Sequence, residues 1–303
     1  MISWKRALLL LCASFFAFTV SAQQQQVDLF KMQDSTSAAP SADSGRGEPV
    51  VNTFYSTRLV NTHTVEITGK GSMDFRINHR FAPVNSGLYN MFGLDNASMR
   101  MGFDFGIAKD LMIGIGRSTS YKELDWFVKY RILHQRTKGS VPLSIALLAA
   151  WAYRTLDYDP TLKVAGSDRT FFTGAVLIGS KLSSTTSIQV SPTYTHYNRV
   201  LNFSSTTKDL FAIGLLARQK VSRRMSINAE YFLQTNKFPG TYDPLSIGVD
   251  INTGGHVFQL HFTNSTGMNE HSAIHETTGS WGGGDVRWGF NISRIFNIGR
   301  RNK

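Results

Sequence analysis

Residues 99–118 read MRMGFDFGIAKDLMIGIGRS and contain the glycine pair of Gly114-Ile115-Gly116. Such pairs also open nucleotide-binding loops, but those loops require a preceding strand, a glycine-rich turn and a following helix. The sequence after Arg117, STSYKELDWFVKYRIL, continues to alternate between polar and apolar types and predicts no helix. The glycines therefore do not indicate a phosphate-binding loop.

A period of two accounts for the whole stretch. The odd-numbered residues from Met99 to Ile107 are large and apolar, whereas the even-numbered residues from Arg100 to Gly106 are charged residues or glycines. Successive side chains of a strand point to opposite faces, so this pattern predicts a strand with one apolar and one polar face. A turn at Lys109-Asp110 leads into a second strand of the same kind. Glycines on the polar face would let such strands curve into a small barrel and leave room inside it.

The first 22 residues, MISWKRALLLLCASFFAFTVSA, have the features of an export signal. Lys5 and Arg6 precede an apolar run that ends in small residues, which predicts cleavage after Ala22. The only cysteine of the chain is Cys12, and Leu11 stands where a lipoprotein signal requires a small residue. The mature chain then lacks cysteine, which excludes disulfides, cysteine metal sites and thiol catalysis.

Basic charge narrows the classes of partner. The formal charge of +11 falls to +9 once Lys5 and Arg6 are removed, and this suits anionic lipid or lipopolysaccharide phosphates. No basic cluster is interleaved with stacking aromatic residues, so we expect no nucleic-acid partner. After the signal no apolar stretch reaches eighteen residues. A chain of this kind can span a membrane only as a barrel.

Alternating segments continue from residue 72 to the end, separated by turn residues, and predict about twelve strands. Short connections (AKD, RTKGS, LSST, VSRR and NTGG) alternate with mostly longer ones, as in outer-membrane barrels with both ends in the periplasm. The fold predicted is all-β, a transmembrane antiparallel up-and-down β-barrel. The expected strands are 72–81, 98–108, 110–118, 122–135, 141–153, 168–180, 185–198, 208–219, 224–235, 244–253, 256–263 and 285–296.

The apolar face of these strands is rich in aromatic residues near the strand ends, among them Trp126, Tyr153, Tyr194, Tyr231 and Trp288. Aromatic girdles at the two membrane interfaces have this distribution. A soluble barrel or sandwich could turn the same face into its core. The opposite face, however, carries too many charges and glycines for an ordinary solvent surface, which favours a lumen.

The chain divides into four regions. Residues 1–22 are the predicted signal peptide, and residues 23–50 are polar and predict a disordered leader. Residues 51–71 precede the first strand, and this N-terminal segment could enter the lumen as a partial plug; the stretch from Val50 to Lys70 reads VVNTFYSTRLVNTHTVEITGK. Residues 72–303 form the predicted barrel.

The block from Ser72 to Leu133 resembles an uncharacterised family of Bacteroidetes outer-membrane β-barrels that is catalogued as a domain of unknown function. The resemblance rests on FRINHRF, on FGLDNASMRMGFDFGIAKDLMIGIGRS and on WFVKYRIL, and extends to HVFQLHFTNSTGMNE and DVRWGFNISRIFNIGR near the end. It implies a barrel in the bacterial outer membrane and no particular reaction. Phe296, a candidate closing aromatic residue, is followed by the basic tail NIGRRNK, a departure from general barrel habit.

The polar face supplies the candidate functional residues, a set of lumen-lining charges. They comprise seven cations and five anions, and we expect facing strands to pair them into ladders because an unpaired buried charge is costly. Such ladders would close the lumen, whereas a hydrated pore would leave the charges apart. The residues are Asp74, Arg76, Arg80, Arg100, Asp104, Asp125, Lys129, Arg131, Arg218, Glu230, Asp250 and Arg287.

Three histidines raise the question of catalysis or metal binding. His196 falls on the apolar face, as in a membrane phospholipase, but no serine follows two residues later. His271 and His275 would share one face of a helix, yet the stretch lacks the HExxH pattern. A solvated loop is the simpler interpretation of that stretch. We expect no catalytic, cofactor-binding or metal-ligating residue.

Together these features predict an exported outer-membrane barrel that is not an enzyme. Its largely closed, ion-paired lumen favours a structural or accessory component, with outer-membrane lipid, lipopolysaccharide and another envelope protein as the expected partners. A narrow passive channel for small solutes is the alternative. A lipid-modifying enzyme is the less favoured third interpretation.

Overall fold

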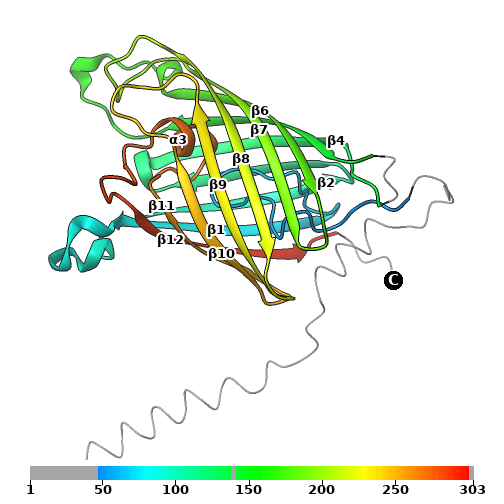
Figure 1. The fold of residues 1–303 in the computed structure, drawn as a ribbon. Coiled ribbons are helices and arrows are strands. Elements are labelled where there is room, and N and C mark those ends of the chain that lie inside the picture. Colours follow the sequence, from blue (N-terminus) through cyan, green and yellow to red (C-terminus); the bar gives the residue numbers. More distant parts are fainter. Residues whose placement is uncertain (1–46, 138–140, 300–303) are drawn as a thin grey trace, which may run out of the picture.

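The computed structural model describes residues 47–137 and 141–299. These residues form twelve antiparallel strands and a few short helical turns (Figure 1). The strands are β1 (Ser72–Pro83), β2 (Ala97–Ala108), β3 (Leu111–Ser118), β4 (Glu123–Leu133), β5 (Ser144–Arg154), β6 (Thr170–Lys181), β7 (Thr186–Tyr197), β8 (Asp209–Lys220), β9 (Met225–Gln234), β10 (Leu245–Asn252), β11 (Val257–Thr263) and β12 (Arg287–Asn297). The predicted strands are confirmed, with ends displaced by at most three residues.

Each strand pairs with its neighbours in the sequence, and the sheet closes by pairing β1 with β12. Ser72 lies opposite Asn297 at one end of this seam, and Arg80 lies opposite Gly289 near the other. The predicted up-and-down barrel is therefore confirmed. Closure leaves every strand hydrogen-bonded on both sides, which removes the exposed edges of an open sheet.

The two ends of the barrel differ in their connections. The short-turn end, as we call it here, carries the tight β2–β3, β6–β7, β8–β9 and β10–β11 turns together with the start of β1 and the end of β12. The opposite long-loop end carries the loops 84–96, 155–169, 198–208, 235–244 and 264–286. These loops hold the helical turns η1 (Val84–Ser86), η2 (Leu88–Gly93), η4 (Pro160–Leu162), η5 (Ser167–Arg169) and α3 (Glu270–His275), and η3 (Ser120–Lys122) lies in a shorter loop there.

The two faces of the strands separate apolar from polar side chains, as in residues 99–118. Met101, Phe103 and Ile115 are exposed on the outside, whereas Arg100 and Asp104 are buried inside. The predicted alternation is thus confirmed for the opening stretch. Outward aromatic pairs such as Phe262 and Trp288, with ring centroids 4.3 Å apart, lie near the long-loop end. None of the helices in the described ranges is long and apolar enough to cross a membrane.

The lumen contains chain from both ends of the barrel. Residues 47–71 enter at the short-turn end, fold into a hairpin in which Arg58 bridges to His63, and return to the start of β1. Every residue from Thr53 to Val65 is buried. The blue segment among the strands in Figure 1 is this hairpin, which we call the N-terminal hairpin. Helix α3 occupies the long-loop end, and five of its residues are buried.

Glycines of the wall make this filling possible. A Cβ atom at Gly106 would collide with the carbonyl oxygens of Thr68 and Gly69, so the glycine admits the backbone of the N-terminal hairpin. A Cβ atom at Gly116 would collide with the guanidinium of Arg100. Gly174 differs from the expectation that strand glycines face inward, because it is exposed on the outer face with open space beside it.

Candidate functional site

The tip of the N-terminal hairpin is held by one carboxylate of the wall, Glu230 on β9. The backbone N–H groups of Val60, Asn61 and Thr62 donate to its oxygens at 3.2 Å, and the Thr62 hydroxyl donates at 3.1 Å. Hydrogen bonds to a charged acceptor are stronger than those between neutral groups. Glu230 therefore satisfies three backbone donors of a buried turn that has no strand partner of its own.

The two lumen-filling segments meet at Arg58 and Glu270. Arg58 Nη1 lies 2.8 Å from Glu270 Oε1, and both side chains are almost completely buried. His63 Nε2 lies 3.6 Å from the same carboxylate oxygen. Burial, and then the charge of Arg58, hold the pKa of His63 well below its ordinary value, so His63 is neutral. The pair of Arg58 and Glu270 thus joins the hairpin to α3 in the middle of the lumen.

Ten of the predicted lumen charges are buried, and Arg131 and Arg287 are partly exposed. Their pairing differs from a ladder between adjacent strands. Arg76 pairs with Asp74 of its own strand at 3.1 Å, and Arg100 reaches across Gly116 of β3 to form an ion pair with Asp125 on β4. The expected ladder between facing strands is therefore wrong, because one of these pairs lies within a single strand and the other reaches along the wall over an intervening strand.

The other buried cations of the wall mostly donate to backbone carbonyls of the N-terminal hairpin. Lys129 Nζ lies 3.1 Å from the Thr64 carbonyl oxygen, and Arg218 Nη1 lies 2.8 Å from that of Thr53. Arg80 donates to the side-chain oxygen of Asn61 at 2.6 Å. Within the described ranges, these inward-facing cations therefore bind the N-terminal hairpin and not the carboxylates of the wall.

In the described part of the chain, four of the predicted lumen charges form neither an ion pair with another member of the set nor a hydrogen bond to the N-terminal hairpin. Asp250 accepts from Gln259 at 3.0 Å, and neither carboxylate oxygen of Asp104 has a hydrogen-bond partner within the described residues. Arg131 pairs with Asp110 at 2.9 Å near the short-turn end. Arg287 donates to the Phe81 carbonyl oxygen at 3.5 Å near the long-loop end.

Sequence reasoning missed a second cluster, at the long-loop end. Arg154 on β5 forms ion pairs with Glu123 on β4 and with Glu276 just after α3. His271 Nε2 lies 3.2 Å from Glu123, and its ring stacks on Phe171 with a centroid distance of 4.5 Å. Glu123 and Arg154 lie opposite each other at the ends of adjacent strands, a signal that the alternation alone could have provided.

The interpretation of the stretch NEHSAIHE, residues 269–276, as a solvated loop is wrong. His271 and His275 are both buried, because α3 turns back into the barrel mouth and docks on β6 and β9. His275 Nδ1 lies 3.1 Å from the side-chain oxygen of Gln234. Across the described ranges, no group of three or more His, Cys, Asp or Glu residues is arranged to hold a metal ion.

Buried histidines make the fold sensitive to acid. Burial, and then the charge of His271, lower the pKa of His275 to about 3, while an unfolded histidine takes up its proton near its ordinary pKa. The unfolded chain then binds more protons below about pH 6.5, so stability is complete above that pH and falls as the pH is lowered.

We expect the free energy of unfolding to fall by about 1.4 kcal/mol per pH unit for each of His63 and His275. Urea titrations of the refolded barrel between about pH 7 and pH 5 would measure this slope. The variant His275→Asn should show a smaller slope with a similar stability at neutral pH. An unchanged slope in that variant would contradict the assignment.

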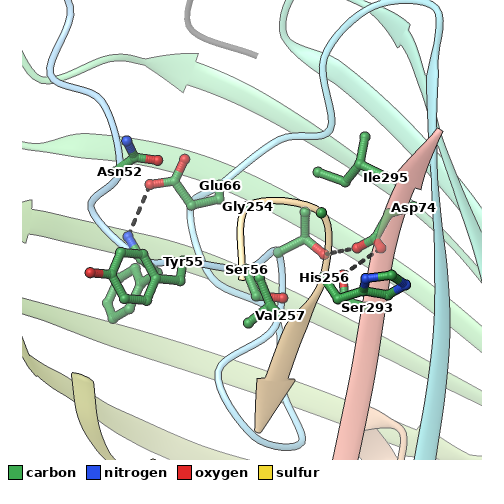
Figure 2. Close-up of a pocket in the computed structure, with 13 residues that line it drawn as sticks. Asn52, Tyr55, Ser56, Glu66, Asp74, Gly254, His256, Val257, Ser293 and Ile295 are labelled. Atoms are coloured by element: carbon green, nitrogen blue, oxygen red, sulfur yellow. Dashed lines mark hydrogen bonds between the residues drawn. The ribbon is translucent and has the colours of Figure 1, made fainter. Parts of the chain in front are cut away.

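A small cavity lies at the short-turn end between the N-terminal hairpin and the β10–β11 turn (Figure 2). Its volume is about 30 Å³, and its lining includes Glu66, Asp74, His256 and Ser293. Ser293 donates to Asp74 at 2.5 Å, and Glu66 accepts from the Phe54 N–H at 3.0 Å. The space suits a buried water and is too small for a solute.

His196 lies on the outer face, as the alternation predicts, and pairs with Asp209. The distance from His196 Nδ1 to Asp209 Oδ1 is 2.7 Å, and the Tyr194 hydroxyl donates to the same oxygen at 2.6 Å. In the part of the chain that the structure describes, no serine is hydrogen-bonded to His196. The arrangement lacks the nucleophile of a Ser-His-Asp triad.

A closed barrel with an apolar outside and a plugged polar inside defines a class, the membrane-bound β-barrels. The chain belongs to the family described as "Membrane bound beta barrel domain (DUF5777)", whose model matches residues 54–296. The resemblance drawn from the sequence to a barrel family of unknown function is confirmed by this match. The matched range begins inside the N-terminal hairpin, so the family model includes most of that hairpin.

Two porins and an autotransporter domain of known structure are similar to this chain in fold. The NanC porin has a TM-score of 0.47 and 8% identity, over 74% of this chain and 98% of that chain. The KdgM porin has a TM-score of 0.43 and 9% identity, over 74% and 99%. The translocator domain of the autotransporter NalP from Neisseria meningitidis has a TM-score of 0.41 and 11% identity, over 76% and 89%. No curated protein matches the chain.

Proposed function

We propose that this protein is a closed barrel of the outer membrane that serves as a structural or accessory component. The observation that carries the proposal is the contact between Arg58 and Glu270, where the two segments that fill the lumen meet. Both side chains are almost completely buried, and so is every residue from Thr53 to Val65, which supports a lumen that is filled at that level. The proposal includes no catalytic step and no cofactor.

The predicted export signal and the exposed side chains of one long loop support the proposed location and partners. Export with cleavage after Ala22 would deliver the barrel to the outer membrane, with its long loops facing outward next to lipopolysaccharide. The loop between β1 and β2 exposes Leu88, Tyr89, Met91 and Phe92. Exposed aromatic and methionine side chains are enriched at protein interfaces, which supports contact with another envelope protein.

A narrow passive channel for small solutes is the second candidate. Several buried polar side chains, among them Asp104, Asn78, Asn228 and His261, have atoms without a hydrogen-bond partner in the described residues. Such atoms favour internal water, because an unsatisfied buried polar group is costly. A wet interior would ease displacement of the hairpin.

Planar-bilayer recording of the refolded wild-type protein decides between the two candidates. We expect no steady current, since Glu230 and Arg58 hold the filling segments inside the wall. Heat-modifiable migration on gels would show that the sample is a folded barrel. A steady ohmic current from such a sample would contradict the closed barrel and support the channel.

A further inference from the structure

A basic cleft lies on the rim of the short-turn end. It has a volume of about 390 Å³ and is bounded by the β2–β3 turn, the end of β4 and the start of the N-terminal hairpin at Pro49. Its charged lining consists of Lys109, Asp110, Arg131 and Arg136. Three permanent cations face one carboxylate, so the cleft carries an excess of positive charge.

The cations differ in how they are already engaged. Arg131 is held by Asp110 through Nε at 3.0 Å and Nη2 at 2.9 Å, which fixes its guanidinium at the edge of the cleft. Arg136 uses one nitrogen, Nη1, to donate to the Gly47 carbonyl oxygen at 3.0 Å. Lys109 is exposed and takes part in no ion pair within the described ranges. Donors on Lys109 and Arg136 therefore remain for an anion.

His134 also lines the cleft and is neutral in the folded protein. Its Nε2 lies 2.8 Å from the Val50 carbonyl oxygen, so that nitrogen carries the proton and donates it. Burial, and then the charge of Arg131, lower its pKa. The histidine consequently fixes the hairpin and adds no charge to the cleft.

One wall of the cleft is apolar and continues onto the face that contacts lipid. Ile132 and Leu133 line the cleft itself, and Tyr130 lies two residues earlier on the same outer face as Ile132. Tyr130 and Ile132 are 51% and 55% exposed. Positive charge next to an outward apolar strip at a barrel rim matches a headgroup phosphate above an acyl chain.

We propose that this cleft binds the phosphate of an anionic phospholipid in the leaflet at the short-turn end. The ammonium of Lys109 and the free guanidinium nitrogen of Arg136 donate to phosphate oxygens, while one acyl chain lies along Ile132 and Tyr130. Arginine and lysine are the usual ligands of phosphate, and a phosphate among them forms charge-assisted hydrogen bonds. The inference is independent of whether the lumen conducts.

The test is native mass spectrometry of the full-length barrel in detergent, titrated with phosphatidylglycerol. We expect one phosphatidylglycerol to bind more tightly than the others and more tightly than phosphatidylcholine. Lys109→Gln should weaken this binding about tenfold, as the loss of one charge-assisted hydrogen bond implies. Lys208→Gln, which removes an exposed cation at the long-loop end, is the matched control and should change nothing.

A second variant and a competitor complete the test. Arg136→Gln should weaken binding as much as Lys109→Gln does, although it also removes the contact with Gly47. Equal lipid binding by wild type and Lys109→Gln would overturn the site. Displacement of phosphatidylglycerol by an excess of inorganic phosphate would overturn the lipid assignment in favour of a free anion, and no displacement would support it.

Discussion

Replacing Gly116 with valine is expected to destabilise the barrel by about 3–5 kcal/mol, the cost of breaking a buried ion pair. The guanidinium of Arg100 passes over Gly116 on its way to Asp125, and a side chain at residue 116 occupies that space. Arg100 is then displaced, and Asp125 is left buried without its cation. Urea unfolding of the barrel in micelles, followed by heat-modifiable migration, would measure the loss.

Two further variants separate the ion pair from the strand. Gly174→Val places the same side chain in a strand where nothing lies within 4 Å of the new Cβ atom, so its stability should stay within about 0.5 kcal/mol of wild type. Arg100→Gln should reproduce the loss without steric conflict. If Arg100→Gln instead left stability unchanged and shifted the reversal potential of a conducting barrel towards cations, the channel would be the better proposal.

Replacing Glu230 with alanine is expected to open the lumen. The N–H groups of Val60, Asn61 and Thr62 lose their common acceptor, and each unsatisfied buried donor costs about 1–3 kcal/mol. Movement of the hairpin tip out of the lumen would let these donors bond to water instead. In planar bilayers this variant should pass a steady current that the wild type lacks.

Ser226→Ala is the matched control for that experiment. Ser226 lies on the same strand and the same inward face as Glu230, and its hydroxyl has no hydrogen-bond partner within the described residues. Its loss should change neither conductance nor stability. If the Glu230→Ala barrel passed no current and kept its normal stability, other contacts would be shown to hold the hairpin in the lumen.

The sequence predicted the wall of the barrel far better than its contents. Alternation is a local property, so residues such as Met101 and Asp104 could be assigned to the outer and inner faces without knowing any contact. The N-terminal hairpin has no such period. Its position depends on Glu230, a residue almost 170 positions away, and no local pattern encodes that contact.

Backbone acceptors explain the wrong pairing of the lumen charges. The alternation places Lys129 and Arg218 in a set of charges expected to form ion-pair ladders, whereas the structure gives them carbonyl oxygens of Thr64 and Thr53. Every residue of a chain carries a carbonyl, so the side-chain sequence cannot show which of them a cation will use. The position of His271 is missed for a related reason, since its imidazole lies 3.2 Å from Glu123 on a strand that is distant in the sequence.

Both filling segments are continuous with the strands of the seam. The N-terminal hairpin runs directly into β1, and the loop that holds α3 runs directly into β12. The two strands that close the barrel are therefore also the strands to which both filling segments are attached. Because β1 pairs with β12, the register of this seam also sets how far the hairpin reaches towards α3, and a slip in that register would move Arg58 away from Glu270.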